Sequence, residues 1–253
     1  MTLKHTKEKD AVIARLGDML KKRLGKDEAG RVVRFSEQYY ARTAPIDLLN
    51  YGIDDLYGAL LSHWHFAGHR TPGKPLVRIF NPVFEEHGWQ STHTVIEVIA
   101  DDMPFLLDSL SMGLIHQGIN IHFTLHPVIP VHRDDAGNLV DVFSTSHEGK
   151  DVINEAFLHF EVDRQADPQT FATLHKNILH VLMDVRLVVD DWKPMRAKMK
   201  AIIDQLSAQS LPLAREEKEE SINFLRWVEK TILLLSVFAP MTLLKKRGRM
   251  CCV

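Results

Sequence analysis

Hydrophobic and polar positions change their period twice in the middle of this chain. Residues 95–99 (VIEVI) form a β-branched run that is typical of a strand buried on both faces. Between Phe105 and Leu114 the apolar residues recur at three- and four-residue spacing, which predicts one buried face of a helix. Residues 119–125 then alternate, which predicts a second strand. The pattern therefore predicts a strand–helix–strand unit within residues 91–132.

Two residues mark the ends of the predicted helix. Pro104 suits a first turn, where the N–H that proline lacks is not needed, and the acidic residues Asp101 and Asp102 just ahead of it favour a helix start. Gly118 predicts the end of the helix, because glycine adopts the left-handed backbone of a helix terminus without steric penalty.

The first 72 residues are predicted to be helical. Residues 12–24 carry an apolar stripe at helical spacing with lysines and arginines on the other face, and similar stripes follow at 32–39 and 56–64. Pro45 and Gly52 interrupt the pattern, and a Thr-Pro-Gly break ends it. The sequence leaves open whether these helices pack on the sheet or on another subunit.

Strands and helices follow one another in the rest of the chain. Strands are expected at 76–80, 139–143 and 156–162, the second as the returning arm of a hairpin with RDDAGN as its turn. A helix is expected from Pro168 through Met183, followed by separate helices after two further prolines. This order favours an α+β fold with an open antiparallel sheet.

We divide the chain into four segments on this basis. They are an N-terminal helical region (1–72), an α+β domain (73–190), a helical linker toward a downstream domain (191–229) and a tail (230–253).

The middle of the chain resembles a known module. A strand ending in Asp, followed by x-x-Pro-(Gly/Phe)-Leu-Leu, a helix and Gly-Ile-Asn-Ile, is similar to the ACT domain, a ferredoxin-like βαββαβ module that senses amino acids. The longer strings DDMPFLLDSLSMGLIHQGINIHFTLHPVIPVHRDDAGNL and FNPVFEEHGWQSTHTVIEV resemble the N-terminal region of the large bacterial NAD-specific glutamate dehydrogenases. This resemblance covers residues 38–227. It implies an ACT-like open antiparallel sheet with helices on one face.

The resemblance also implies a role. The whole enzyme would convert glutamate, NAD and water to 2-oxoglutarate, ammonia and NADH, in a catalytic domain far downstream of this region. The segment would then be a non-catalytic regulatory or assembly region with no cofactor of its own, NAD being bound by the full-length enzyme. Its expected partners are an amino-acid effector, other copies of itself and the other domains of the enzyme.

ACT-like modules hold small amino acids beside the first strand–helix loop, which predicts a ligand site here. By resemblance, the residues are Asp101, Asp102, Met103 and Pro104, with Gly118, Ile119 and Asn120 facing across. Helix N-terminal N–H groups attract a carboxylate, but the proline removes one donor and the two acids repel an anion. Phe105 stands where the common Asp-x-Pro-Gly form has the glycine that gives ligand access. A structural, oligomer-forming role is therefore favoured over amino-acid binding.

Composition excludes several classes of function. A net charge of −2 argues against a nucleic-acid partner held by bulk electrostatics. Cys251 and Cys252 are adjacent at the end of the chain, so no disulfide framework is expected. The first 30 residues carry charge throughout and lack the apolar stretch of a secretory signal. We therefore expect a cytoplasmic protein with no membrane partner.

The sequence holds many histidines but no complete catalytic or metal-binding motif. The chain has 14 histidines, and His63, His65 and His69 invite a zinc interpretation, since the last two would share a helix face. The glutamate of H-E-x-x-H is missing and no third ligand follows at a characteristic spacing, so we predict satisfied or exposed histidines and no metal site. The motifs G-x-G-x-x-G, G-x-x-x-x-G-K-[ST] and G-x-S-x-G are absent, so no catalytic or cofactor-binding residue is predicted.

The tail differs in composition from the rest of the chain. Residues 230–253 hold five basic residues and no acidic one. Codons for a glutamate-rich segment typical of the related dehydrogenases, read one base out of frame, can give SVFAPMTLLKKRGRMCC. We therefore hypothesise a frameshifted translation that truncates a longer enzyme, which the nucleotide sequence of the gene would decide. The rival interpretation is a native tail in which residues 245–249 favour an anionic membrane surface.

Two other functions stay open at this point. The first is a stand-alone amino-acid-sensing ACT-like module that acts by binding alone. The second is a helical interaction protein that associates with a partner through residues 1–70.

Overall fold

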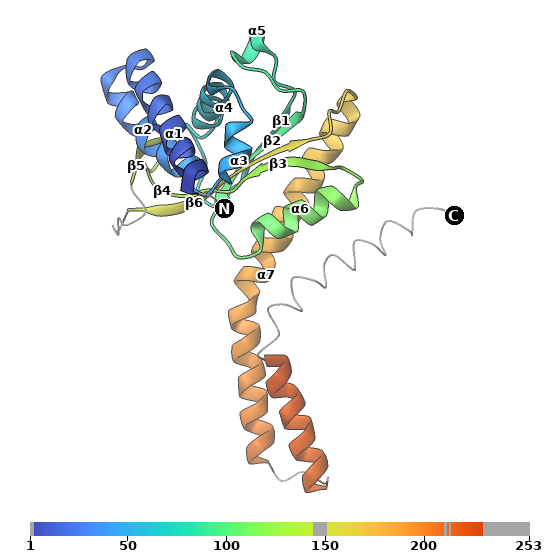
Figure 1. Ribbon diagram of the computed structural model, residues 1–253. Coiled ribbons are helices and arrows are strands. Elements are labelled where there is room, and N and C mark those ends of the chain that lie inside the picture. Colours follow the sequence, from blue (N-terminus) through green and yellow to red (C-terminus); the bar gives the residue numbers. More distant parts are fainter. Residues whose placement is uncertain (1–2, 144–150, 210–211, 213, 230–253) are drawn as a thin grey trace. The chain divides into compact units, whose positions relative to one another are not determined.

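The computed structural model describes residues 3–143, 151–209, 212 and 214–229 (Figure 1). Two compact units make up the chain. The first combines Met1–Asp102 with Leu110–Leu179, and the second combines Met103–Ser109 with His180–Val253. The predicted tail lies outside the described residues, and the predicted boundaries of the four segments stay predictions. Within the described part of the chain no helix has the length and apolar character needed to cross a bilayer.

Helices come first, as predicted. They are α1 (Leu3–Arg23), α2 (Lys26–Tyr39), α3 (Pro45–Leu49) and α4 (Ile53–Phe66). Strand β1 (Leu76–Phe80) follows, and then a short helix that the sequence did not predict, α5 (Phe84–His87). The remaining elements are β2 (Thr94–Asp101), α6 (Leu106–His116), β3 (Ile121–Leu125), β4 (Val128–Arg133), β5 (Leu139–Val142), β6 (Ile153–Val162) and α7 (Pro168–Ala208).

One antiparallel sheet contains all six strands of the described residues. Its order is β1-β2-β6-β4-β5, and β3 also pairs with β6. Strands β3 and β4 pair with successive parts of β6, since Thr124 is opposite Phe160 and Val128 is opposite Ala156. The α+β class and the open antiparallel sheet are confirmed, and the two strands of the predicted strand–helix–strand unit share this sheet.

The two faces of the sheet are covered by different helices (Figure 1). On one face, apolar β6 residues such as Leu158 and Phe160 are buried, as are Leu110 and Leu114 of α6 and Leu174 of α7. The N-terminal helices α1–α4 pack on the opposite face. There they form one core with the sheet that includes Leu16, Leu20, Phe35, Leu60, Trp64, Ile99 and Phe157. The sequence predicted helices on one face of the sheet, and the structure has a second helical layer, α1–α4, on the other face. Each fully buried apolar side chain contributes about 1.5–3 kcal/mol, so this interface is a large part of the fold's stability.

The start of α6 differs from the prediction. The helix begins at Leu106, and Phe105 just before it has a φ of 65°. Asp101 does not cap the helix, because it is the last residue of β2 and its carboxylate is paired with an arginine. A left-handed backbone costs a residue with a Cβ about 1–2 kcal/mol, which explains the glycine at this position in the common Asp-x-Pro-Gly form.

The end of α6 is as predicted. Gly118 has a φ of 75°, and the N–H of Ile119 donates to the carbonyl of Leu114 at 3.2 Å. This bond closes a Schellman motif, which satisfies a carbonyl that the helix end would leave without a partner.

Helix α7 is longer than predicted. The break expected at Pro194 is wrong, because a single helix of 41 residues continues through this proline. Proline removes one backbone donor in a helix interior and normally kinks or ends it. In the second unit, residues 215–229 are also helical. Buried Ile203 and Ile222, and a hydrogen bond of 2.5 Å from Arg196 Nε to Glu229 Oε1, hold this unit together.

Candidate functional site

The sheet face beneath α1–α4 carries buried polar residues in a mainly apolar setting. Glu155, His159 and Glu161 on β6 and Glu97 on β2 are each at most 3% exposed. Side chains alternate along a strand, so the three β6 residues share one face while their apolar neighbours occupy the other. Burying a charge is costly unless it is paired and hydrogen-bonded, so the partners of these groups decide what they do.

The first group is an arginine cluster of Arg70, Arg133, Glu155 and Asp101. Arg70 donates from Nε to Glu155 Oε1 at 2.8 Å and from Nη2 to Asp101 Oδ1 at 2.6 Å. Arg133 donates to both oxygens of Glu155, at 2.6 and 2.8 Å. Its remaining donor reaches the backbone carbonyls of Ala67 and Gly137. Both guanidinium groups are thus held by the carboxylates, and the cluster ties the end of α4 to β4 and β6.

The second group is a histidine–glutamate cluster of His63, Glu97 and His159. These three residues lie on α4, β2 and β6 and are at most 1% exposed. One nitrogen or oxygen from each lies within 4.8 Å of the other two. His63 Nε2, Glu97 Oε1 and His159 Nδ1 have no hydrogen-bond partner, although each is buried.

The outward-facing atoms of the same cluster do have partners. The Tyr39 hydroxyl lies 2.8 Å from His63 Nδ1. Arg78 donates from Nε to Glu97 Oε2 at 3.0 Å, and Glu161 Oε1 lies 3.7 Å from His159 Nε2. The three residues are therefore oriented from outside, and their unpartnered atoms face one another. Two imidazoles and a carboxylate form a donor set suited to transition metals such as zinc.

Burial shifts the protonation of this cluster. It lowers the pKa of His63 well below the usual range, with His159 and Arg78 adding to the effect, so the imidazole is neutral at pH 7. Burial also raises the pKa of Glu97, and the Arg78 guanidinium offsets part of that rise. At Glu161 burial again raises the pKa, but the interaction with His159 and a hydrogen bond from Ser91 outweigh burial, so the net pKa is lowered.

A surface pocket of about 330 Å³ opens beside Glu161. Its lining includes Tyr51, His93 and His122. The rings of the two histidines are 4.5 Å apart between centroids, and His122 Nε2 lies 2.7 Å from Asp163 Oδ1. This pocket offers both imidazole and carboxylate groups to a small polar ligand.

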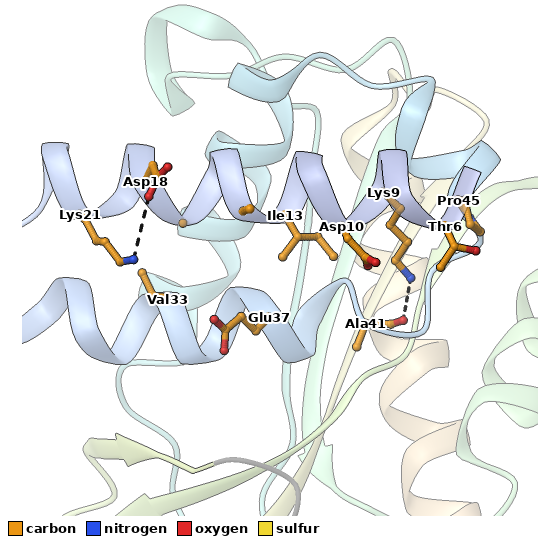
Figure 2. Close-up of a pocket in the computed structure, with 12 residues that line it drawn as sticks. Thr6, Lys9, Asp10, Ile13, Asp18, Lys21, Val33, Glu37, Ala41 and Pro45 are labelled. Carbon is orange, nitrogen blue, oxygen red and sulfur yellow. Dashed lines mark hydrogen bonds and ion pairs between the residues drawn. The ribbon is translucent and has the colours of Figure 1, made fainter. Parts of the chain in front are cut away.

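A second surface pocket, of about 720 Å³, lies between α1 and α2 (Figure 2). Lys9 is one of its lining residues, and its Nζ donates to the carbonyls of Ala41 and Thr43 at 2.6 and 2.7 Å. The labelled side chains in Figure 2 mix acidic residues such as Asp10 and Glu37 with lysines and small apolar groups. The lysine fixes the segment after α2, and the mixed lining indicates no particular class of ligand.

The structure separates the residues of the predicted ligand site. Asp101 is opposite Glu155 at one end of β6, whereas Ile121 is opposite Val162 at the other end. Seven residues of strand at about 3.3 Å each place these ends roughly 23 Å apart. One amino acid therefore cannot contact both predicted segments within this chain.

Each segment of the predicted site has its own contacts. The N–H of Asp102 donates to the carbonyl of Asn154, and the backbone and side-chain N–H groups of Asn120 donate to Asp163 Oδ2 at 3.1 and 2.7 Å. Gly118 is exposed and Ile119 is 8% exposed. Met103 and Pro104 belong to the second unit. Amino-acid binding by either segment stays a prediction.

The described strands differ in arrangement from the nucleotide-binding fold of many dehydrogenases. A nicotinamide cofactor normally binds where parallel strands feed a glycine-rich turn and a helix N-terminus. The strands described here are paired antiparallel throughout, and both faces of the sheet are covered.

Sequence reasoning missed the histidine–glutamate cluster. It singled out His63 for its neighbours in sequence, His65 and His69, both of which are exposed. The ligand-like partners of His63 are Glu97 and His159, which adjoin each other only through the pairing of β2 with β6. The available signals were Glu97 inside the apolar run of β2 and the polar residues Glu155, His159 and Glu161, which alternate with apolar residues along β6.

The comparisons with known proteins all give one enzyme family, the NAD-specific glutamate dehydrogenases. The family model for the glutamate dehydrogenase ACT1 domain matches residues 35–178. An NAD-specific glutamate dehydrogenase from Halomonas elongata is 40% identical over 218 residues, covering 86% of this chain and 14% of that protein. One from Pseudomonas aeruginosa is 36% identical over 209 residues, covering 83% and 13%. One from Mycobacterium tuberculosis is 22% identical over 168 residues, covering 66% and 10%. The chain thus spans about one seventh of the length of the first two relatives.

Proposed function

We propose that this chain is a non-catalytic regulatory or assembly region of an NAD-specific glutamate dehydrogenase. The chain belongs to the family of these enzymes. The match of residues 35–178 to the ACT1 domain carries this proposal. The relatives are several times longer than this chain, so the catalytic machinery of the family has room outside it.

The longer enzyme would oxidise glutamate with NAD and water to 2-oxoglutarate, ammonia and NADH. NAD would be bound by the downstream part, and this region would contribute no residue to hydride transfer. The site of action would be the cytoplasm, and the partners would be the other domains of the enzyme, a second copy of this region and an amino-acid effector.

The placement of the acid–base groups supports a role without catalysis. Glu97, His159 and Glu155 are at most 1% exposed beneath the N-terminal helices, so a substrate in solution has no access to them. The two guanidinium groups of the arginine cluster are engaged by carboxylates and backbone carbonyls. These groups therefore serve the fold, whereas a catalytic acid or base must reach the reacting atoms.

A complementation experiment tests the proposal. The downstream part of a close relative, expressed without its first residues, is assayed for glutamate-dependent NADH formation with and without this chain added in trans. We expect the added chain to change the rate, the KM for glutamate or the oligomer size measured by light scattering. A downstream part that is indistinguishable in all three respects with and without the chain would argue against a regulatory or assembly role.

The second candidate is a stand-alone amino-acid sensor. The pocket beside Glu161 favours it, because carboxylate and imidazole groups there can bind the ammonium and carboxylate groups of an amino acid. Calorimetry with a panel of amino acids separates the two functions. A sensor shows saturable binding to the isolated chain that weakens in His122→Ala and not in His65→Ala, an exposed histidine on α4.

A further inference from the structure

Three unpartnered atoms meet under the N-terminal helices. His63 Nε2, Glu97 Oε1 and His159 Nδ1 are buried and make no hydrogen bond, and they lie within 4.8 Å of one another, with His159 Nδ1 and Glu97 Oε1 4.0 Å apart. A buried polar group without a partner costs about 1–3 kcal/mol, so three of them at one point are a large penalty unless something binds between them. Their convergence from α4, β2 and β6 indicates a common ligand.

The chemistry of the three atoms limits what that ligand is. Two imidazole nitrogens and one carboxylate oxygen form the donor set of many zinc and related transition-metal sites. Calcium and magnesium prefer oxygen ligands, so they fit poorly. The immediate surroundings hold two carboxylates, Glu97 and Glu161, against one guanidinium, Arg78, so an added cation meets net negative charge.

The outer contacts match those of metal ligands. A ligating histidine normally uses its second ring nitrogen in a hydrogen bond that fixes its orientation and tautomer. His63 Nδ1 is hydrogen-bonded to the Tyr39 hydroxyl at 2.8 Å, whereas His159 Nε2 lies 3.7 Å from Glu161 Oε1, an ion-pair contact that is longer than a hydrogen bond. Glu97 is fixed by its other oxygen, which accepts from Arg78. Each of the three ligand atoms is thereby left facing inward.

We propose that His63, Glu97 and His159 bind one divalent transition-metal ion, Zn²⁺ above all. The ion joins the N-terminal helices to the two central strands, because the three ligands lie on α4, β2 and β6. Its role is structural, since α1–α4 cover the cluster, and a ligand other than these three residues would complete the four-coordinate shell that zinc normally has. It thus holds the helical region on the sheet, which is a property separate from the proposed regulatory function.

The test uses the full 253-residue chain with Cys251→Ser and Cys252→Ser in every sample, because adjacent thiols are themselves zinc ligands. The protein is stripped with a chelator and titrated with Zn²⁺ in a competition assay. Metal content is measured by mass spectrometry, and Co²⁺ is used as a spectroscopic probe. We expect one ion per chain, a higher melting temperature with metal, and Co²⁺ ligand-field bands typical of nitrogen and oxygen ligands.

Matched variants decide whether the ion is at this cluster. His63→Gln and Glu97→Gln should weaken Zn²⁺ binding more than 100-fold, and Tyr39→Phe, which removes only an outer hydrogen bond, by about 10- to 100-fold. His65→Gln, an exposed histidine on the same helix, should leave binding unchanged.

Some outcomes contradict the metal site. The proposal is overturned if the parent chain binds no stoichiometric Zn²⁺, or if the His63 and Glu97 variants bind it as the parent does. If those two variants fail to fold, the Tyr39→Phe protein decides, and unchanged Zn²⁺ affinity in that protein overturns the proposal. Failure here leaves the regulatory proposal intact, because that is judged on the downstream enzyme.

Discussion

Replacing Glu155 by glutamine removes the charge on which the arginine cluster depends. Glu155 is fully buried and accepts hydrogen bonds at 2.8 Å from Arg70 and at 2.6 and 2.8 Å from Arg133. Without its charge, the one remaining carboxylate of the cluster is the partly exposed Asp101, which pairs with Arg70, and Arg133 loses its carboxylate partner. Breaking a buried pair from one side costs about 3–5 kcal/mol. Glutamine keeps one acceptor oxygen, so we expect a loss near 3 kcal/mol, a large part of a typical stability of about 5–15 kcal/mol.

Urea unfolding followed by tryptophan fluorescence measures this loss. Trp192 and Trp227 belong to the second unit, so changing both to phenylalanine leaves Trp64 and Trp89 as reporters of the first. The control is Asp54→Asn, which breaks the exposed 3.5 Å pair with Arg23. Exposed pairs contribute about 0–1 kcal/mol.

The result that would refute this reasoning is specific. Suppose that the free energy of unfolding of the glutamine variant is within about 1 kcal/mol of that of the parent chain, and that its slope against urea concentration is unchanged. The buried carboxylate then does not hold the two arginines together. A control that loses as much as the variant would show that burial does not decide the value of these pairs.

Three further predictions follow from backbone and side-chain geometry. Gly58→Ala places a Cβ 2.3 Å from the Trp89 side chain, so it should destabilise the chain by about 1–3 kcal/mol in the same urea assay. Phe105→Gly should be about 1 kcal/mol more stable than Phe105→Ala, because both lose the ring and only glycine accepts a φ of 65° freely. Hydrogen bonds, the largest contribution being that from His122, lower the pKa of Asp163 in the folded chain. The ionised carboxylate therefore stabilises the folded state above about pH 3.9, and this stabilisation is lost as the pH falls through the lower folded-state pKa. An NMR titration of the Asp163 carboxyl group measures that pKa.

Each of these has an outcome that contradicts it. Gly30→Ala, in an exposed part of α2 with its nearest atom at 3.9 Å, should stabilise by up to about 1 kcal/mol and is the control for Gly58. Equal effects of the two alanines would exclude the proposed clash. If the Phe105→Ala protein is as stable as the Phe105→Gly protein, the turn relaxes at no cost. A titration midpoint of Asp163 at or above about pH 3.9 would show that its hydrogen bonds do not favour the charged form.

Local pattern was sufficient to predict most elements. The β-branched run at 95–99 is buried in β2, the RDDAGN turn joins β4 to β5, and Gly118 ends α6 with a left-handed backbone. Each of these follows from side-chain period or from the conformational freedom of one residue. Pro194 shows the limit of such rules, because α7 continues through it.

The arrangement of the site could not be predicted in the same way. His63 and Glu97 are brought together by the packing of α4 on the sheet, and Glu97 meets His159 through the register of β2 with β6. Neither contact corresponds to a characteristic spacing of residues in the sequence. The predicted ligand site failed to form one patch for a related reason, since its two segments lie at opposite ends of β6.

The most direct test of the central claim is a glutamate dehydrogenase assay on the purified 253-residue chain. With saturating glutamate and NAD, and with metal-loaded and metal-free protein compared, we expect no glutamate-dependent formation of NADH. NADH formation that co-purifies with the chain and is abolished in Glu97→Gln would contradict the proposal, because it would place catalysis in a region that we propose to be non-catalytic.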